Sequence, residues 1–489
     1  MKKLFRILVC VLPAVLYFSY YPLIHFGESE SMNFEISLPL IWLVLFDLTV
    51  MMLIARKRDF WRGILKYWMW LLLPVWLSLT VIWSQNVVRG LLTAGIMWLL
   101  YFAVYGFYYL KDLFDAHLRK KFWKIFLVST VVVCGWCLVQ CVLDLVGVGR
   151  EYSLMCNGCT YTMFGFPHPN GFAIEPQFMG NLLLAPAIII VWMLFKNYSG
   201  SDFLSFKLLL ICFLVVISTL FLTFSRGAIY AFTVALIFVS VFIIVKNKKK
   251  QTSKTAVRSV GIVWGLTIFS FLFSLNLQGI MAAVSPTNDT YVTGVTKVLN
   301  HLSLGIIDVR DKKSEEMQAL ESEITEEESD GGEILIVEKP VENLVENRDE
   351  NAAVFDGYVA ESTETRLRLS GVAIGVWQGD FTTMMFGVGL GGAGQALYKA
   401  DLSPSPKEIV QNQYVSLLLE TGILGIILLI FTVGLILRAL IKMEDGVMII
   451  ALVIAYGVSL CFFAGLPNAL HVYLLPVTMV VLMTKKNRQ

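Results

Sequence analysis

Apolar runs about as long as a bilayer is thick recur along this 489-residue chain, and no other feature restricts its fold as strongly. A membrane-spanning helix needs about 20 apolar residues, because its backbone must satisfy its own hydrogen bonds within the hydrocarbon. A hydrophobic fraction of 57% exceeds what a soluble core uses. We therefore expect an all-α polytopic membrane protein of about 12 transmembrane helices. The runs are Leu4–Tyr21, Leu38–Ile54, Ile64–Trp83, Leu91–Leu110, Ile125–Val146, Phe178–Phe195, Leu208–Phe224, Ala228–Val245, Val260–Leu275, Tyr414–Leu440, Val447–Phe463 and Asn468–Met483.

The basic residues predict how these spans are oriented. Their clusters all fall on the same predicted face of the membrane, and such clusters mark the cytoplasmic side. Both termini are then cytoplasmic, and the connection between spans nine and ten lies outside. The chain divides into residues 1–276 with spans one to nine, an external loop over 277–410, and residues 411–489 with spans ten to twelve. The clusters are Lys2-Lys3, Arg56-Lys57-Arg58, Arg119-Lys120-Lys121, Lys246 with Lys248-Lys249-Lys250, Arg438 with Lys442, and Lys485-Lys486.

The external loop has two parts of different character. Residues 308–364 hold 19 of the 37 acidic residues and few large apolar ones, so this part cannot bury enough surface to offset chain entropy. We expect a flexible, solvated insertion there, with capture of a cationic partner as the alternative. Apolar residues return after it, and they predict a helix along the membrane surface near 366–380.

Few residues point to a metal or a cofactor. Cys156-Asn-Gly-Cys159 offers half the ligands of a structural zinc site, and a disulfide or two free thiols both remain open. The glycines of residues 386–394 lack the Lys-Ser/Thr ending of a nucleotide-binding loop. The outer loops show no Asp-x-Asp pattern. We expect no metal, no cofactor and no nucleic-acid partner.

Arg226 is the sharpest single candidate for binding. It lies in Ser225-Arg226-Gly227, between two apolar runs with almost no loop between them, so its charge sits at membrane depth. A guanidinium can bind phosphate oxygens through two parallel hydrogen bonds. The alternative is snorkelling to lipid headgroups. The small pair Gly227-Ala228 suggests room for a ligand.

Asp47 lies in span two, where its charge is also costly. We expect a polar partner for it from another span.

A candidate base lies at the outer mouth of span six. Glu175 precedes Pro176, and a carboxylate near a low-dielectric surface can have its pKa raised into a useful range. The alternative is a carboxylate that favours the start of a helix. Four further residues on the outer side are secondary candidates: Arg89, His168, Arg368 and His471.

Several short motifs together resemble one family. They are Trp83-Ser84, Ser225-Arg226-Gly227-Ala228, Arg366 upstream of Gly387-Val388-Gly389, Gln411-Asn412, and Glu420-Thr421-Gly422-Ile423-Leu424-Gly425. In this order, with a large loop between spans nine and ten, they are similar to the O-antigen ligase/polymerase superfamily of bacterial cell-envelope glycosyltransferases. The resemblance implies a C-type glycosyltransferase-like helical fold.

The resemblance also implies roles for individual residues. Arg226 and Arg366 look like the two arginines that engage the diphosphate of an undecaprenyl-linked glycan donor. Ligases place a histidine, proposed to activate the acceptor, where this chain has Gln411, next to Asn412. Glutamine can orient a hydroxyl but cannot take its proton at neutral pH. Glu175 resembles a Glu-Pro found in some polymerases, so we count Glu175, Gln411 and Asn412 as candidate catalytic residues.

These observations predict a metal-independent glycosyltransferase of the bacterial cytoplasmic membrane. It would transfer an undecaprenyl-diphosphate-linked oligosaccharide to an acceptor glycan on the outer face, as a polymerase or a ligase-like enzyme, with other polysaccharide-assembly proteins as further partners. A flippase for the same lipid-linked sugars is the alternative from another class. It should show matching halves and charges near the bilayer midplane. A non-catalytic envelope assembly protein is the third possibility, and its arginines should be replaceable.

Overall fold

A computed structural model describes most of the chain. Cys156, Cys159 and the acidic segment up to residue 353 lie outside the described residues. The described residues are 1–26, 34–54, 57, 60, 62–63, 68–145, 168–198, 205–248, 253–284, 290–303, 354–403, 410–443, 445–464 and 469–483.

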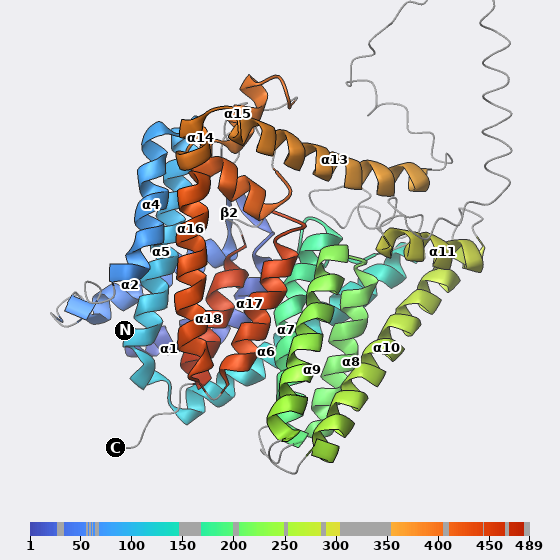
Figure 1. Ribbon diagram of the computed structural model, residues 1–489. Coiled ribbons are helices and arrows are strands. Elements are labelled where there is room, and N and C mark those ends of the chain that lie inside the picture. The colour runs from blue at the N-terminus through green and yellow to red at the C-terminus, as the bar shows by residue number, and fades with distance from the viewer. Residues whose placement is uncertain are drawn as a thin grey trace, which may run out of the picture.

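Helices account for nearly all of the described structure (Figure 1). The α-helices are α1 (Lys2–Val15), α2 (Leu38–Ile54), α4 (Leu72–Thr80), α5 (Val87–Tyr109), α6 (Ala116–Leu145), α7 (Pro176–Tyr198), α8 (Phe206–Leu222), α9 (Arg226–Lys248), α10 (Ser253–Val284), α11 (Tyr291–Leu302), α13 (Val354–Trp377), α14 (Phe381–Phe386), α15 (Ala393–Lys399), α16 (Gln413–Ile441), α17 (Gly446–Ser459) and α18 (Leu470–Met483). Short 3-10 turns are η1 (Leu16–Phe18), η2 (Trp68–Leu71), η3 (Val81–Trp83) and η4 (Lys111–Leu113). Each of the twelve apolar runs contains helix, so the all-α polytopic class is confirmed.

Among the described residues, six helices are long and apolar enough to cross a membrane. They are Val87–Tyr109, Ala116–Leu143, Pro176–Lys196, Arg226–Lys246, Ala256–Val284 and Gln413–Ile441. Five further apolar helices are shorter: Leu38–Ile54, Trp68–Trp83, Phe206–Leu222, Gly446–Ser459 and Leu470–Leu482. A bundle of membrane helices follows from these lengths, while the total of twelve spans stays a prediction.

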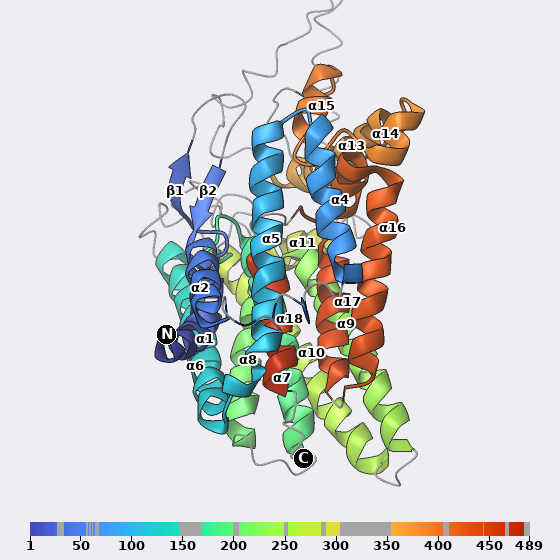
Figure 2. The same cartoon turned by 90° about the vertical axis from the view of Figure 1, so that its left-hand side faces the viewer.

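Helix α7 lies at the centre of the bundle and α16 lies at its edge. The apolar window of α7 is 94% buried, against 11% for α16. Helices α8, α9 and α17 pack around α7. Figure 2 shows α16 beside α4 at the opposite side of the molecule from α6. Glu175 lies immediately before this buried helix, and Gln177 lies in its first turn.

Three features were not predicted from the sequence. A two-stranded antiparallel sheet pairs β1 (Pro22–Phe26) with β2 (Phe34–Ser37), and strands of five and four residues are too short for a clear period. Helices α11, α14 and α15 lie within the large loop. Helix α10 runs past residue 276 to Val284, because Met281 and Ala282 pack with Val298 of α11.

Helix α13 covers the end of the bundle where the site lies. It contains most of the segment near 366–380 that was expected to be helical, but it ends at Trp377. Figure 1 shows α13 running across the ends of the upright helices, with α11 beside the ends of α8 to α10. Both chain termini lie in the lower half of that view, away from α13.

Candidate functional site

The turn between α8 and α9 presents Arg226 as the first residue of α9. Phe224 precedes it with a φ of 46°, a left-handed conformation that is strained for a bulky residue. His301 of α11 holds this turn, because its Nε2 lies 3.0 Å from the Phe224 carbonyl oxygen. That oxygen can only accept, so Nε2 carries the proton. Ser225 Oγ accepts a hydrogen bond from Ala228 N at 3.4 Å and so begins the helix.

Gly227 lines the pocket and also lets a neighbouring side chain come close. A Cβ at this position would lie 2.8 Å from the Cβ of Phe462, so the missing side chain admits Phe462 beside the pocket. Gly180 of α7 plays a similar part, because a Cβ there would lie 2.7 Å from the Cβ of Ser225. The two glycines bring α7, α9 and the end of α17 into close contact around Arg226.

The first turn of α7 provides the acidic side of the site. The loop before it is tied to α6, where Gln140 Oε1 accepts from Gly171 N at 2.9 Å and Gln140 Nε2 donates to Asn170 Oδ1 at 3.0 Å. Glu175 follows this loop, and Gln177 donates through Nε2 to Glu175 Oε2. The main-chain oxygen of Gln177 accepts from Ser225 Oγ at 3.4 Å, which links the α7 turn to the α8–α9 turn.

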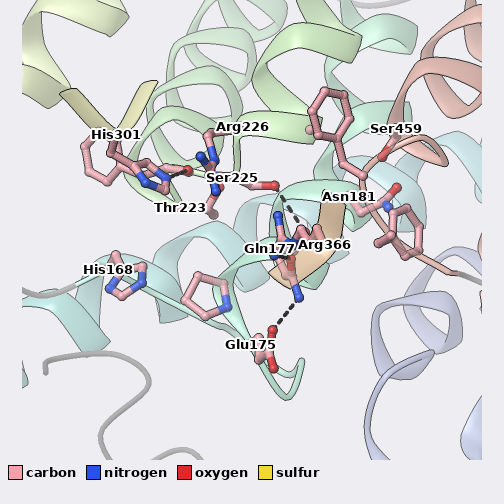
Figure 3. A pocket seen from close by; sticks show the side chains of 15 residues that line it. His168, Glu175, Gln177, Asn181, Thr223, Ser225, Arg226, His301, Arg366 and Ser459 are labelled. Carbon is pink, nitrogen blue, oxygen red and sulfur yellow. Dashed lines mark hydrogen bonds between the residues drawn. The ribbon is translucent and has the colours of Figure 1, made fainter. Parts of the chain in front are cut away.

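Arg366 reaches this place from α13. Its Nη2 donates to Gln177 Oε1 at 3.0 Å, and its Nε donates to Gln411 Oε1 at 2.6 Å. Gln411 stands just before α16, so Arg366 joins three elements that are far apart in the sequence. Figure 3 shows Arg366 and Gln177 between Glu175 on one side and Arg226 with His301 on the other.

These side chains surround one pocket of about 70 Å³, several times the roughly 10–15 Å³ that one water needs. It therefore has room for several ligand atoms. The lining residues are His168, Glu175, Pro176, Gln177, Asn181, Thr223, Phe224, Ser225, Arg226, Gly227, His301, Arg366, Ser459, Phe462 and Phe463.

The electrostatics of the pocket favour an anion. Arg226 is only 6% exposed, so its guanidinium is largely removed from solvent. Burial and the nearby Arg226 lower the pKa of His301 to about 3, which makes its imidazole neutral near neutral pH. Burial raises the pKa of Glu175, against the lowering effects of the Gln177 hydrogen bond and of Arg366. Two arginines and one carboxylate leave a net positive charge where hydration is limited.

Four of the predicted site residues line this pocket: Glu175, Arg226, Arg366 and His168, which is 2% exposed. Gln411 meets the site through Arg366. Asn412 is the N-cap of α16, and its Oδ1 accepts from Tyr414 N and Val415 N at 3.0 and 3.2 Å. A local structural bond therefore accounts for the Asn412 side chain.

The other candidates lie elsewhere. Arg368 is exposed on α13. His471 is buried in the bundle between the rings of Tyr20 and Tyr456, at centroid distances of 5.4 and 5.7 Å. Asp47 is 5% exposed, and neither carboxylate oxygen has a hydrogen-bond partner among the described residues, so the expected polar partner is not found there.

Arg89 and the glycine-rich stretch form a separate structural unit. Val388 N donates to Leu419 O at 2.8 Å, and Ser84 Oγ donates to Leu390 O at 2.8 Å. The Glu420 carboxylate accepts from the backbone N–H groups of Gly391 and Ala393 and lies near Arg89. This unit joins the start of α5 to α16, so packing explains these motifs.

Sequence reasoning missed Gln177, Asn181, His301 and Ser459. Gln177 follows Glu175 by two residues at the same predicted helix start, and that position could have suggested it. His301 is a lone histidine in the large loop, Asn181 lies inside span six and Ser459 inside span eleven. No local pattern marks these three, because the pocket is assembled from α7, α11 and α17.

The fold and the site define a class of protein: a helical membrane protein with a buried cationic pocket at one end of its bundle. Residues 210–430, a little under half of the chain, match the family model described as O-Antigen ligase. The resemblance to the O-antigen ligase/polymerase superfamily is thereby confirmed for this segment, which carries Arg226, His301, Arg366 and Gln411. Comparison with curated proteins and with solved structures found no match. The match over residues 210–430 supports ligase-like glycan transfer in general terms.

Proposed function

We propose that this protein transfers an undecaprenyl-diphosphate-linked oligosaccharide to an acceptor glycan at the outer face of the bacterial cytoplasmic membrane. The observation that carries the proposal is the single pocket in which Arg226 and Arg366, from distant parts of the chain, meet Glu175. Polymerase and ligase-like activity share this chemistry. Gln411 as an acceptor for Arg366, together with Glu175 in the pocket, favours a polymerase.

The reaction needs a site for the leaving group. The acceptor hydroxyl oxygen forms a bond to the anomeric carbon, and the bond from that carbon to the diphosphate oxygen breaks. The electron pair of the broken bond goes to the diphosphate. Arg226 and Arg366 offer planar forks for its oxygens, and charge stabilisation is strong in a site with little water. We propose that these two residues take the place that a divalent metal has in many soluble enzymes.

The reaction also needs a place for a proton. The acceptor hydroxyl loses its proton as its oxygen bonds to the sugar, and Glu175 is the carboxylate in the pocket that would take it. Burial raises the pKa of Glu175, which makes it a stronger base than an exposed carboxylate. It must be ionised to act, so the rate should fall as the pH drops through its raised pKa.

The arginines provide the decisive test. Arg226→Lys and Arg366→Lys keep the charge but lose the planar fork, so each should lower transfer by at least about tenfold, the loss of one good charged hydrogen bond. The measurement is glycan transfer from a lipid-linked donor by purified protein in liposomes. Because both residues serve one leaving group, the double variant should lose much less than the product of the single effects.

Arg368→Lys is the matched control, since Arg368 is exposed on the same helix as Arg366, and its activity should equal that of wild type. EDTA should leave wild-type activity intact. Fully active lysine variants, or activity lost on chelation and restored by magnesium, would contradict the proposal. Movement of the lipid-linked sugar across the liposome without transfer would indicate a flippase.

A further inference from the structure

The Gln177 side chain stands between the carboxylate and one of the guanidinium groups of the pocket. Arg366 can only donate hydrogen bonds, so the oxygen of the Gln177 amide must face it, at 3.0 Å from Nη2. The amide NH2 is thereby turned toward Glu175 and donates to Oε2. The donor and acceptor roles of Arg366 and Glu175 therefore fix which end of the Gln177 amide is oxygen and which is nitrogen.

An ionised carboxylate oxygen accepts a hydrogen bond from an NH2 group more strongly than the hydroxyl oxygen of a carboxylic acid does. The bond to Glu175 Oε2 therefore disfavours a proton on that oxygen and favours the ionised carboxylate. Its effect opposes the rise in the pKa of Glu175 that burial causes. The same bond leaves Oε1 as the oxygen at which Glu175 can accept a proton.

Building on the proposed function, we infer that Gln177 is a positioning residue for the transfer reaction: it keeps Glu175 ionised and leaves Oε1 to take the proton of the acceptor hydroxyl. Gln177 itself touches no reacting atom in this scheme. Its position is secured by α7, whose first turn is also tied to Ser225 through the Gln177 main-chain oxygen.

Four other charged or titratable groups line the pocket with Glu175. They are His168 before α7, Arg226 of α9, His301 of α11 and Arg366 of α13. The arginines keep their charge at every working pH, and the pKa of about 3 keeps His301 neutral. The acid limb of the pH–rate profile should therefore reflect the ionisation of Glu175. The variant His168→Gln checks whether the His168 imidazole also contributes.

Gln177→Met tests the inference, because methionine has a similar length but cannot donate to Glu175. With saturating donor, kcat should fall about tenfold on the acid side of the pH–rate profile, the effect of one charged hydrogen bond, and should return to within about twofold of wild type at pH values well above the raised pKa of Glu175. Recovery at high pH is the sign of a positioning role. A purely structural role would lower kcat by one factor at every pH.

A second variant keeps the test sharp if methionine disturbs folding. Gln177→Glu preserves shape, places a like charge beside Glu175 and pairs with Arg366. It should move the acid limb to higher pH and raise the KM for the donor. Asn181→Leu is the matched control, since Asn181 lines the same pocket from the next turn of α7. Its acid limb should coincide with that of wild type.

An acid limb that stays in place, or moves to lower pH, in both Gln177 variants would overturn the inference. Glu175→Gln separates this failure from failure of the proposed function. If Glu175→Gln is fully active, Glu175 is not the base and the proposed mechanism is wrong. If it is inactive while the Gln177 variants keep a wild-type pH profile, only the role of Gln177 is wrong.

Discussion

Arg366 donates hydrogen bonds to two glutamine oxygens, and this choice of acceptor matters for binding. A neutral amide orients a guanidinium without cancelling its charge, whereas a carboxylate would form an ion pair and compete with an anionic ligand. Gln411 and Gln177 hold Nε and Nη2 of Arg366 at 2.6 and 3.0 Å. The side chain is thus placed beside the pocket while its positive charge remains available there.

Glu175 offers the most direct test of the acid–base step. Glu175→Gln keeps the shape and the polar contacts but cannot accept a proton, so turnover should fall by about two to four orders of magnitude. Protein level and binding of a non-transferable donor analogue should persist, as measured by gel filtration and isothermal titration. Normal turnover would mean that Glu175 is not the base and only favours the start of α7. Gln411→His is the companion variant, and we expect transfer to continue in it.

The break in α16 shows how secondary-structure elements are joined on the side away from the pocket. Gly422 has a φ of 67° within the helix, and Gly387, Gly389 and Gly391 also have positive φ. Carbonyl groups freed near the break accept from the glycine-rich turn, as when Gly389 N donates to Glu420 O at 3.0 Å. The turn thus satisfies backbone groups that a continuous helix would satisfy internally.

Gly389→Ala should destabilise the protein. Its φ is 92°, and a Cβ there would lie 2.2 Å from the Cα of Ser84. Left-handed strain and overpacking together should cost on the order of 2–4 kcal/mol. Thermal unfolding in detergent should show a lower midpoint. Gly371→Ala is the control: a Cβ at this helical position meets nothing within 4 Å, so the midpoint should stay or rise slightly. Equal midpoints for the two variants would contradict this account of the turn.

The arrangement of the whole bundle places the pocket at one end. Helix α13 crosses that end, and the chain termini lie toward the other (Figure 1). A site at the end of a membrane bundle can meet a substrate whose one part is hydrocarbon and whose other part is water-soluble. Topology experiments determine on which side of the membrane that end of the bundle lies.

Reporter fusions test the orientation of the chain. An alkaline phosphatase fused within residues 321–350 should be active, because that enzyme needs the oxidising environment outside the cytoplasmic membrane. Fusions at Lys248 or Lys486 should be inactive there and should instead support a cytoplasmic reporter. A cytoplasmic signal from the 321–350 fusion would place the pocket on the wrong side for transfer to an external acceptor.

The sequence alone determined where the apolar bundle helices form and what general fold class the protein belongs to. A lipid environment requires every backbone group to be satisfied within the segment, so long apolar runs predict helices almost by themselves. The run Leu38–Ile54 and α2 have the same bounds. Arg226 was also recognisable, because a charge between two apolar runs is costly and so stands out.

Only the tertiary structure decided which side chains meet. The bundle helices are apolar on all sides, so their sequences do not indicate which face turns toward a neighbour. His168 and His471 were equal candidates, yet one lines the pocket and the other is buried between tyrosine rings. Arg366 and Gly389 belong to the same stretch of the sequence. Arg366 lines the pocket, whereas Gly389 packs at the break in α16. Packing between helices decides these contacts, and a local sequence pattern does not predict it because the contacting residues lie far apart in the chain.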